Sequence, residues 1–275
     1  MSERLPPAHA PFLTAVDLAE DLRALGLSPG DSVFAHGALR RIGPMISGPD
    51  TLISAMLDVV SPEGTVLAYT DWHAPVLEEF PDGVPAGLRE HVPPFEPAAS
   101  RSIRDNGALP EFLRTTPGAR RSSSAGASVA ALGGRSEWFT EGHPLDYGYG
   151  PGSPLAKLVE AGGKVAMIGA PWDTMTLLHH AEHLADLPDK RVVRYEAPLA
   201  TPSGTVWRTI EEFDTSRPVI DGFDDDYFAT IVTSFVDSGR GVRGRVGAAD
   251  TLVVGAAEMC AYAVQWMQDN GPRRR

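Results

Sequence analysis

The sequence predicts an α/β fold: a central, largely parallel sheet flanked by helices, an α/β/α sandwich, with a smaller antiparallel sheet. Three observations support this class. Apolar segments of strand length alternate with segments of helical period along the chain. Short turns rich in Gly and Pro separate them, as at 28–31 and 61–64. Two strand-like segments flank a short Gly/Pro turn, which predicts an antiparallel hairpin over about 192–214.

The first part of the chain supplies the alternating pattern. Residues Thr14–Asp17 form a variant capping box, and the helix that follows ends at Gly26. A strand is expected at 32–36, a helix begins near Pro49, and the next strand occupies 65–70. Helices and strands in this order, joined by short turns, are typical of helices packed on a parallel sheet.

A lid-like segment and a second series of elements complete the predicted fold. Residues 71–103 have no period and form more than a simple connection, so we expect them to make a lid or wall over a site. The elements expected beyond it are a helix over 107–115, a strand or short helix beginning at 129–132, a helix from 153 to 162, a strand over 164–170, a helix over 174–187, a hairpin of strands 191–199 and 205–213, and helices over about 225–238 and 250–268. All of them belong to a single domain over residues 1–275.

Composition and charge restrict the functional class. The 275 residues are 43% apolar and 22% charged, which is typical of a globular protein. With 24 basic against 36 acidic residues the net charge is −12, which argues against nucleic acid and favours a cationic small molecule. We expect no export signal, no membrane span and a buried thiol at the single cysteine, Cys260, and therefore a cytoplasmic protein. It is expected to act as a monomer or homodimer.

The densest ionisable cluster is His179, Glu182 and His183, which share a helix face at positions i, i+3 and i+4. The pattern His-x-x-Glu-His is that of an inverted zincin, in which both imidazoles bind zinc. Alternatively, one neutral imidazole takes a proton from an attacking amine while a carboxylate one turn away fixes its tautomer. A helix with solvated histidines is the third interpretation, and these residues alone leave all three open.

Two loops carry the cations and small residues that suit an anionic ligand. The first loop consists of His36, Gly37, Ala38, Leu39, Arg40 and Arg41, and the second contains Arg120, Arg121, Ser122, Ser124 and Ser128. Each loop alone is also consistent with a polar turn. Together, in an acidic chain, they predict an anionic ligand held apart from a cationic one.

Carboxylates at three places could hold the cationic ligand. They are Asp71, with Trp72 beside it, Glu78 in the lid-like segment, and Glu212 with Asp214 in the last hairpin strand. Because side chains alternate along a strand, Glu212 and Asp214 point to one face. Several carboxylates around one cavity would bind a polyamine through charge-assisted hydrogen bonds, although solvated acids at a strand end would look the same.

The order and spacing of these segments resemble the aminoglycoside 3-N-acetyltransferases, from about Ala15 to Gln268. The motifs that carry the resemblance are His36-Gly37-Ala38-Leu39 with Ile42-Gly43-Pro44, Gly64-Thr65-Val66, Pro93-Pro94-Phe95-Glu96-Pro97, Pro117-Gly118-Ala119-Arg120-Arg121-Ser122, Gly152-Ser153-Pro154, Gly162-Gly163-Lys164, and Leu178-His179 with Ala181-Glu182. The resemblance implies an α/β sandwich with a small antiparallel part. It also implies metal-free transfer of acetyl from acetyl-CoA to the 3-amino group of the antibiotic's 2-deoxystreptamine ring, conferring resistance.

The resemblance further implies roles for individual residues. His179 is then the general base and Glu182 its partner, and His183 stands where many members have no histidine, which argues against zinc. The residues expected to contact acetyl-CoA are His36, Gly37, Ala38, Leu39, Arg40, Arg121, Ser122, Ser124, Ser128 and Ser153. Those expected to hold the acceptor are Asp71, Trp72, Glu78, Glu212 and Asp214.

Two departures from the family pattern fall in these loops. Many members have His-Pro-Asp where this chain has Ser124-Ala125-Gly126, and a serine where it has Ala38. We expect the acetyl-CoA chemistry to be kept and the acceptor, or its affinity, to change. The alternatives are an N-acyltransferase acting on a different, biosynthetic amine, a drug-binding relative without activity, and a zinc hydrolase that uses His179 and His183.

Overall fold

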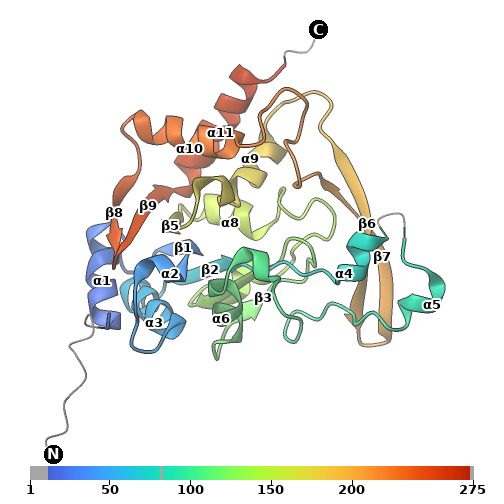
Figure 1. Cartoon of the computed structure of the whole chain (residues 1–275), viewed down its shortest axis with the longest axis horizontal. Coiled ribbons are helices and arrows are strands. Elements are labelled where there is room, and N and C mark those ends of the chain that lie inside the picture. The colour runs from blue at the N-terminus through green and yellow to red at the C-terminus, as the bar shows by residue number, and fades with distance from the viewer. Residues whose placement is uncertain (1–11, 81–82, 273–275) are drawn as a thin grey trace, which may run out of the picture.

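A seven-stranded sheet forms the centre of the structure, a computed structural model that describes residues 12–80 and 83–272. Its strands run in the order β3-β4-β2-β1-β5-β9-β8, with helices on both faces (Figure 1). They are β1 Ser32–Gly37, β2 Thr65–Tyr69, β3 Arg120–Arg121, β4 Val129–Gly133, β5 Lys164–Ile168, β8 Val242–Val246 and β9 Ala249–Gly255. The second sheet is the hairpin of β6 Val192–Thr201 and β7 Gly204–Phe213, as the sequence predicts.

The helices follow the predicted order with additional short turns. They are α1 Ala15–Ala24, α2 Leu39–Ile42, α3 Pro49–Val60, α4 Pro75–Glu79, α5 Ala86–Arg89, α6 Leu109–Thr115, α7 Ser136–Thr140, α8 Pro154–Glu160, α9 Leu177–Leu184, α10 Tyr227–Asp237 and α11 Ala256–Asn270, with the 3₁₀ turns η1 Arg104–Asn106 and η2 Trp172–Thr174. The capping box before α1 is confirmed, because the Thr14 hydroxyl accepts from the Asp17 amide and the Asp17 carboxylate accepts from the Thr14 amide.

The α/β class is confirmed, but the sheet is less parallel than expected. Strand β1 lies parallel to β2 and β5 at the centre. The other four pairings described within this sheet, β2–β4, β3–β4, β5–β9 and β8–β9, are antiparallel. The difference arises because β4 and β9 each follow the preceding strand, β3 or β8, through a hairpin that reverses the chain, and each then lies between that strand and the central strands.

The prediction of a helix over 250–268 is wrong for its first residues. Residues 249–255 form the strand β9, and α11 begins only at Ala256. The run Thr251–Val254 is buried throughout, so it fits a helix or a central strand equally by periodicity, and its β-branched residues favour the strand. Strand β8, which no expectation included, lies at the sheet edge and exposes most of its residues.

The core consists of two apolar layers, one on each face of the sheet. Phe34 and Leu67 point to the face covered by α8 to α11, whereas their neighbours Val33 and Val66 point to the face covered by α1, α3 and α6 (Figure 1). Cys260 on α11 is buried in the first layer, as expected, and burial raises the pKa of its thiol to about 11. Over residues 12–80 and 83–272, no helix is long and apolar enough to cross a membrane.

The lid-like segment packs on the hairpin at one end of the sheet (Figure 1). Phe95 forms a β-bridge with Leu199 of β6 and lies in a small apolar cluster with Ala197 and Ile210. A second cluster joins residues of the segment around Val92 to Trp207 of β7. The segment also contains the short helices α4 and α5. Because of these contacts, it forms a wall fixed to β6 and β7.

Candidate active site

His179 and Glu182 lie on α9, the helix that follows the central strand β5. Leu177, Leu178 and Ala181 of this helix are buried in the core, which fixes its rotation. His179 lies on the opposite side of the helix, where it lines a cavity. Its side chain is 20% exposed, and that of Glu182 is 2% exposed.

The two side chains form a short hydrogen bond, in which His179 Nδ1 lies 2.6 Å from Glu182 Oε2. A carboxylate accepts, so the proton of this bond belongs to Nδ1, and the neutral ring keeps its lone pair on Nε2. The hydroxyl of Tyr227, at the start of α10, donates to the other oxygen of Glu182. Burial and the nearby Glu182 charge raise the pKa of Tyr227 well above its usual value, so it remains a donor. The arrangement is that of a general base with a fixed tautomer.

Aromatic rings hold the imidazole between them. The His179 ring centroid lies 5.1 Å from that of Tyr149 and 4.9 Å from that of Phe228. The cavity beside it has a volume of about 140 Å³, and its lining includes Glu182 and Tyr227 together with Asp173 and Asp225. Its lining also includes Arg217, so three carboxylates face one guanidinium and the net negative charge suits a cationic ligand.

Sequence reasoning missed several of these residues. It gave no role to Asp173, Asp225, Tyr227 or Phe228. The available signal was the adjacency of acids and aromatics in Phe223 to Phe228, but which of them would face α9 depended on the packing of α10.

His183 is engaged elsewhere. Its Nε2 lies 2.9 Å from Glu212 Oε1 of β7, and its ring contacts Phe213 at 4.6 Å. His179 and His183 are thus paired with different carboxylates. They do not face one common point, as two ligands of the same zinc ion would. In the described part of the chain, no three His, Cys, Asp or Glu side chains are arranged to hold a metal ion.

A second cavity of about 260 Å³ lies at the carboxyl end of β1 and includes His36, Gly37 and Ala38 in its lining. We call it the groove. A Cβ on Gly37 would lie 2.8 Å from Leu109 Cδ2, so glycine lets α6 pack closely against the end of β1. His36 Nε2 is buried with no hydrogen-bond partner among the described residues, and burial lowers the pKa of its ring to about 4. An orphaned polar atom in the lining suits a ligand with amide groups.

The groove approaches the His179 pair through two residues. Thr176 lines the groove, and its carbonyl accepts from the His179 amide at 3.1 Å. Tyr69 also lines the groove, and its hydroxyl bonds that of Tyr149, the ring beside His179. Leu39 and Arg40, expected at the same site, begin α2 just after the groove, and Arg40 is exposed.

The serines that were expected to contact acetyl-CoA do not line the groove. Ser122, Ser128 and Ser153 are buried and use their hydroxyls inside the protein, Ser122 toward Val129 and His143, Ser128 toward Thr70, and Ser153 as the cap of α8. Ser124 is buried as well. None of these described side chains lines the groove, so cofactor contact by their hydroxyls remains a prediction without geometric support.

Arg121 also has internal partners. Its guanidinium donates to Ser128 Oγ at 3.0 Å and to the carbonyls of Ser100 and Thr70, and it lies 4.8 Å from the Phe95 ring. Burial lowers the pKa of Arg121 to about 10. The side chain therefore ties the end of β2 to the lid-like segment, and a contact of Arg121 with a phosphate likewise has no geometric support.

The expected acceptor carboxylates do not form one wall. Asp71 is buried beside the groove and accepts from Asn106, and burial raises its pKa to about 6. Its neighbour Trp72 is half-buried, with its ring 5.6 Å from that of Phe95. Glu212 pairs with His183, as described above. The side chain of Glu78 lies outside the described residues.

Asp214 lies at the end of β7, next to the His179 cavity. Burial alone would raise its pKa, but hydrogen bonds from Ser216 and Arg217 lower it, and Arg217 lines the cavity. The period-two expectation is consistent with the burial of both Glu212 and Asp214. Both acids, however, already have partners within the protein.

A histidine–carboxylate pair beside a groove that suits an extended amide chain is an arrangement able to support acyl transfer. Comparison with known proteins agrees. The family model "Aminoglycoside 3-N-acetyltransferase" matches residues 34–268. Aminoglycoside N(3)-acetyltransferase III of Pseudomonas aeruginosa is 41% identical over 266 residues, 96% of this chain and 94% of that protein. Aminoglycoside N(3)-acetyltransferase VIII of Streptomyces fradiae is 41% identical over 258 residues, 91% of this chain and 90% of that protein.

Solved structures give the same result. The structure described as AAC-IIIb binary with CoASH is 58% identical, with a TM-score of 0.93 and coverage of 96% of this chain and 100% of that one. AAC-VIa bound to sisomicin is 33% identical, with a TM-score of 0.90 and coverage of 96% and 100%. The chain belongs to the aminoglycoside 3-N-acetyltransferase family.

Proposed function

We propose that this chain transfers acetyl from acetyl-CoA to the 3-amino group of an aminoglycoside, with His179 as general base, and so confers antibiotic resistance. The observation that carries the proposal is the 2.6 Å bond between His179 and the buried Glu182, at the junction of the groove and an acidic cavity. Relatives named as aminoglycoside acetyltransferases, one of them with CoASH, support the acceptor and the donor.

The acceptor amine must be neutral to attack, so the site needs a group that takes a proton. Nε2 of the neutral His179 is that group, because Nδ1 already donates to Glu182. When the proton arrives, the carboxylate faces an imidazolium at hydrogen-bond distance and stabilises it. Acetyl-CoA, when bound, supplies the acetyl group as a thioester.

Tyr227 is a positioning residue in this scheme. Its hydroxyl occupies one oxygen of Glu182, which leaves the other oxygen directed to His179. Because Glu182 is buried, these two donors take the place of water around its carboxylate. Tyr227 therefore acts on the reaction through Glu182.

His36, Gly37, Ala38 and the following α2 are the residues best placed to hold the pantetheine arm of the donor, since they line or adjoin the groove. The other ammonium groups of the acceptor would meet Asp173 and Asp225 beside His179. The chain would act as a monomer or homodimer.

The departure Ser124-Ala125-Gly126 belongs to the acceptor side. The Ala125 carbonyl accepts from the Trp72 amide at 2.8 Å, and the Gly126 carbonyl accepts from Tyr69 and Tyr149. A Cβ on Gly126 would overlap the Tyr195 hydroxyl of β6. This loop shapes the wall between the lid-like segment and the hairpin, which supports an altered acceptor range with unchanged donor chemistry.

Thiol release from acetyl-CoA, measured against a panel of aminoglycosides that includes members without a free 3-amino group, tests the proposal. We expect release only with acceptors that carry this amine, and a loss of at least ~100-fold in kcat for His179→Ala, the usual scale for a positioned base. Near wild-type turnover in that variant, or turnover only with unrelated amines, would contradict the assignment.

A further inference from the structure

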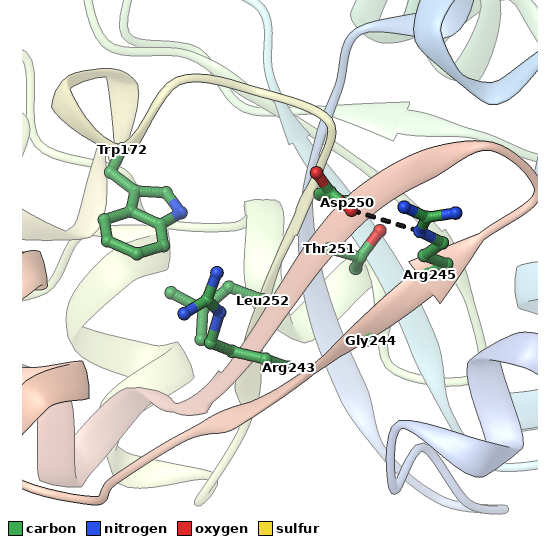
Figure 2. A pocket seen from close by; sticks show the side chains of 7 residues that line it. All are labelled: Trp172, Arg243, Gly244, Arg245, Asp250, Thr251 and Leu252. Carbon is green, nitrogen blue, oxygen red and sulfur yellow. Dashed lines mark hydrogen bonds and ion pairs between the residues drawn. The ribbon is translucent and has the colours of Figure 1, made fainter.

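His143 and His180 are two buried histidines to which the proposed reaction gives no role. They are 5% and 3% exposed. An ion pair at the protein surface, such as Arg245 with Asp250 on the β8–β9 hairpin (Figure 2), is surrounded by solvent that screens it. A buried imidazole must instead find its partners within the protein, because burial of a polar group without hydrogen bonds costs free energy. The partners of these two rings therefore show what the rings hold in place.

His143 lies in the loop between α7 and α8 and joins a later part of this loop to the sheet. Its Nε2 lies 2.6 Å from the Gly148 carbonyl, which accepts, so Nε2 carries the proton. Its Nδ1, 2.8 Å from Ser122 Oγ, then accepts from that hydroxyl. Ser122 Oγ is itself fixed, because it accepts from the Val129 amide of β4 at 2.9 Å. The sheet thus holds the Gly148 carbonyl through one serine and one imidazole.

His180 holds the next carbonyl of the same loop. Its Nδ1 lies 2.7 Å from the Tyr149 carbonyl, so this nitrogen carries the proton. His180 follows His179 on α9, and neighbouring residues on a helix point about 100° apart. One helix therefore presents the proposed base to its cavity and an anchor to the loop. Burial lowers the pKa of both rings, that of His143 to about 4, so both are neutral near neutral pH and keep these roles.

Tyr149 is the residue whose two peptide carbonyls are held in this way. Its ring centroid lies 5.1 Å from that of His179, and its hydroxyl bonds that of Tyr69, which lines the groove. Residues 141–153 form turns between α7 and α8, so no helix or strand places this ring. Ser153 Oγ adds a longer contact, 3.2 Å, to the Tyr149 carbonyl. The hydrogen bonds to the two carbonyls place the ring instead.

We propose that His143 and His180 are positioning residues of the acetyl transfer, which act by holding the Tyr149 ring against His179. The bond to Glu182 fixes one edge of the His179 ring, and contact with Tyr149 restricts the tilt of the ring about that bond. Nε2 then keeps its direction toward the acceptor amine, and a base that is displaced from this direction loses rate. The inference rests on the proposed function, because it takes His179 as the general base.

Conservative and non-conservative variants of each histidine test the inference through kcat for thiol release at saturating acetyl-CoA and aminoglycoside. His180→Leu removes the donor to the Tyr149 carbonyl, and we expect kcat to fall about tenfold, the scale of one hydrogen bond. His180→Asn, whose amide nitrogen can occupy the position of Nδ1, should stay within about threefold of the unmodified chain. His143→Leu and His143→Gln should show the same contrast, because the glutamine amide can replace Nε2. If a leucine variant does not fold, Ser122→Ala frees the His143 ring with a smaller change and should lower kcat in the same direction.

The variant Tyr149→Leu separates positioning from a loss of stability. In this background the aromatic ring is gone, so His180→Leu should lower kcat by less than about twofold further. Thr65→Val is the matched control, since it removes a buried hydrogen bond of 2.8 Å to the Arg135 amide at the start of β2. It should lower the melting temperature as much as His180→Leu does and leave kcat unchanged.

The Cε1–Hε1 NMR signal of His179, assigned by its absence in His179→Ala, reports the ring contact without turnover. We expect both leucine variants to shift it toward its position in Tyr149→Leu, and Thr65→Val to leave it in place. An unmoved signal, equal kcat losses for the leucine and amide variants, or losses that multiply with that of Tyr149→Leu would overturn the inference while the proposed function stands. Near wild-type turnover in His179→Ala would instead remove the proposed function, and this inference with it.

Discussion

Replacing Tyr227 by phenylalanine tests the hydrogen-bond chain Tyr227–Glu182–His179 with little change in packing. The ring would keep its contacts with Phe223 and Phe228, at centroid distances of 5.0 and 4.7 Å, and lose only the hydroxyl that donates to Glu182. A hydrogen bond to a charged, buried acceptor contributes about 1.5 to 3 kcal/mol. If the activation free energy rises by this whole amount, kcat falls by about 10- to 100-fold.

Steady-state thiol release with acetyl-CoA and an accepted aminoglycoside measures this effect. We expect kcat to fall and the KM for acetyl-CoA to stay close to that of the unmodified chain, because the Tyr227 hydroxyl donates to Glu182 and acts on the proton transfer. Tyr262→Phe is the matched control. It removes a part-buried hydroxyl of α11 that lies 2.6 Å from Ser234 Oγ of α10. Its kcat should not change.

A double-mutant cycle separates positioning from general loosening. If Tyr227 acts only through Glu182, then Tyr227→Phe combined with Glu182→Gln should lose no more activity than Glu182→Gln alone. Losses that simply multiply, or equal kcat values for the Tyr227 and Tyr262 variants, would refute the reasoning.

Two further predictions concern the acceptor side. The pKa of Asp71 is raised from 3.8 to about 6 by burial, so its ionisation opposes folding: stability linked to this group is full below pH 4 and declines by about 3 kcal/mol as the pH rises through 6. Asp71→Asn should remove that slope from chemical unfolding curves measured between pH 4 and 7, and an unchanged slope would show that another group causes it. Gly126→Ala should destabilise the protein by about 1 to 3 kcal/mol through overlap with the Tyr195 hydroxyl. Melting curves should show partial recovery in a Tyr195→Phe background, and equal losses in both backgrounds would argue against the overlap.

Much of the site was predictable because it depends on local spacing. The i, i+3 relation of His179 and Glu182 places them on one helix face in any fold that keeps the helix. The run His36-Gly37-Ala38 likewise ends a buried strand, where a groove forms at the carboxyl edge of the sheet. The hairpin over β6 and β7 followed from its turn residues.

Tertiary structure decided which side chains are free. Ser122, Ser128 and Arg121 look like ligand groups in sequence, but β4, the end of β2 and, for Arg121, the lid-like segment give them internal partners. His183 shares the helix face of His179 in a helical projection, yet β7 presents Glu212 to it. A side chain's availability depends on neighbours that are distant along the chain, and no local pattern contains them.

The sequence by itself predicted the proposed His179–Glu182 pair, the α/β class and the family resemblance, because each rests on residues close together or on motifs in a fixed order. Only the tertiary structure decided the antiparallel share of the sheet and the packing of α10 that brings Tyr227 to Glu182. It also decided that neighbouring residues of η2 face different cavities, Asp173 that of His179 and Thr174 the groove. These features arise where separate segments meet, and the burial of apolar surface over the whole chain selects that arrangement.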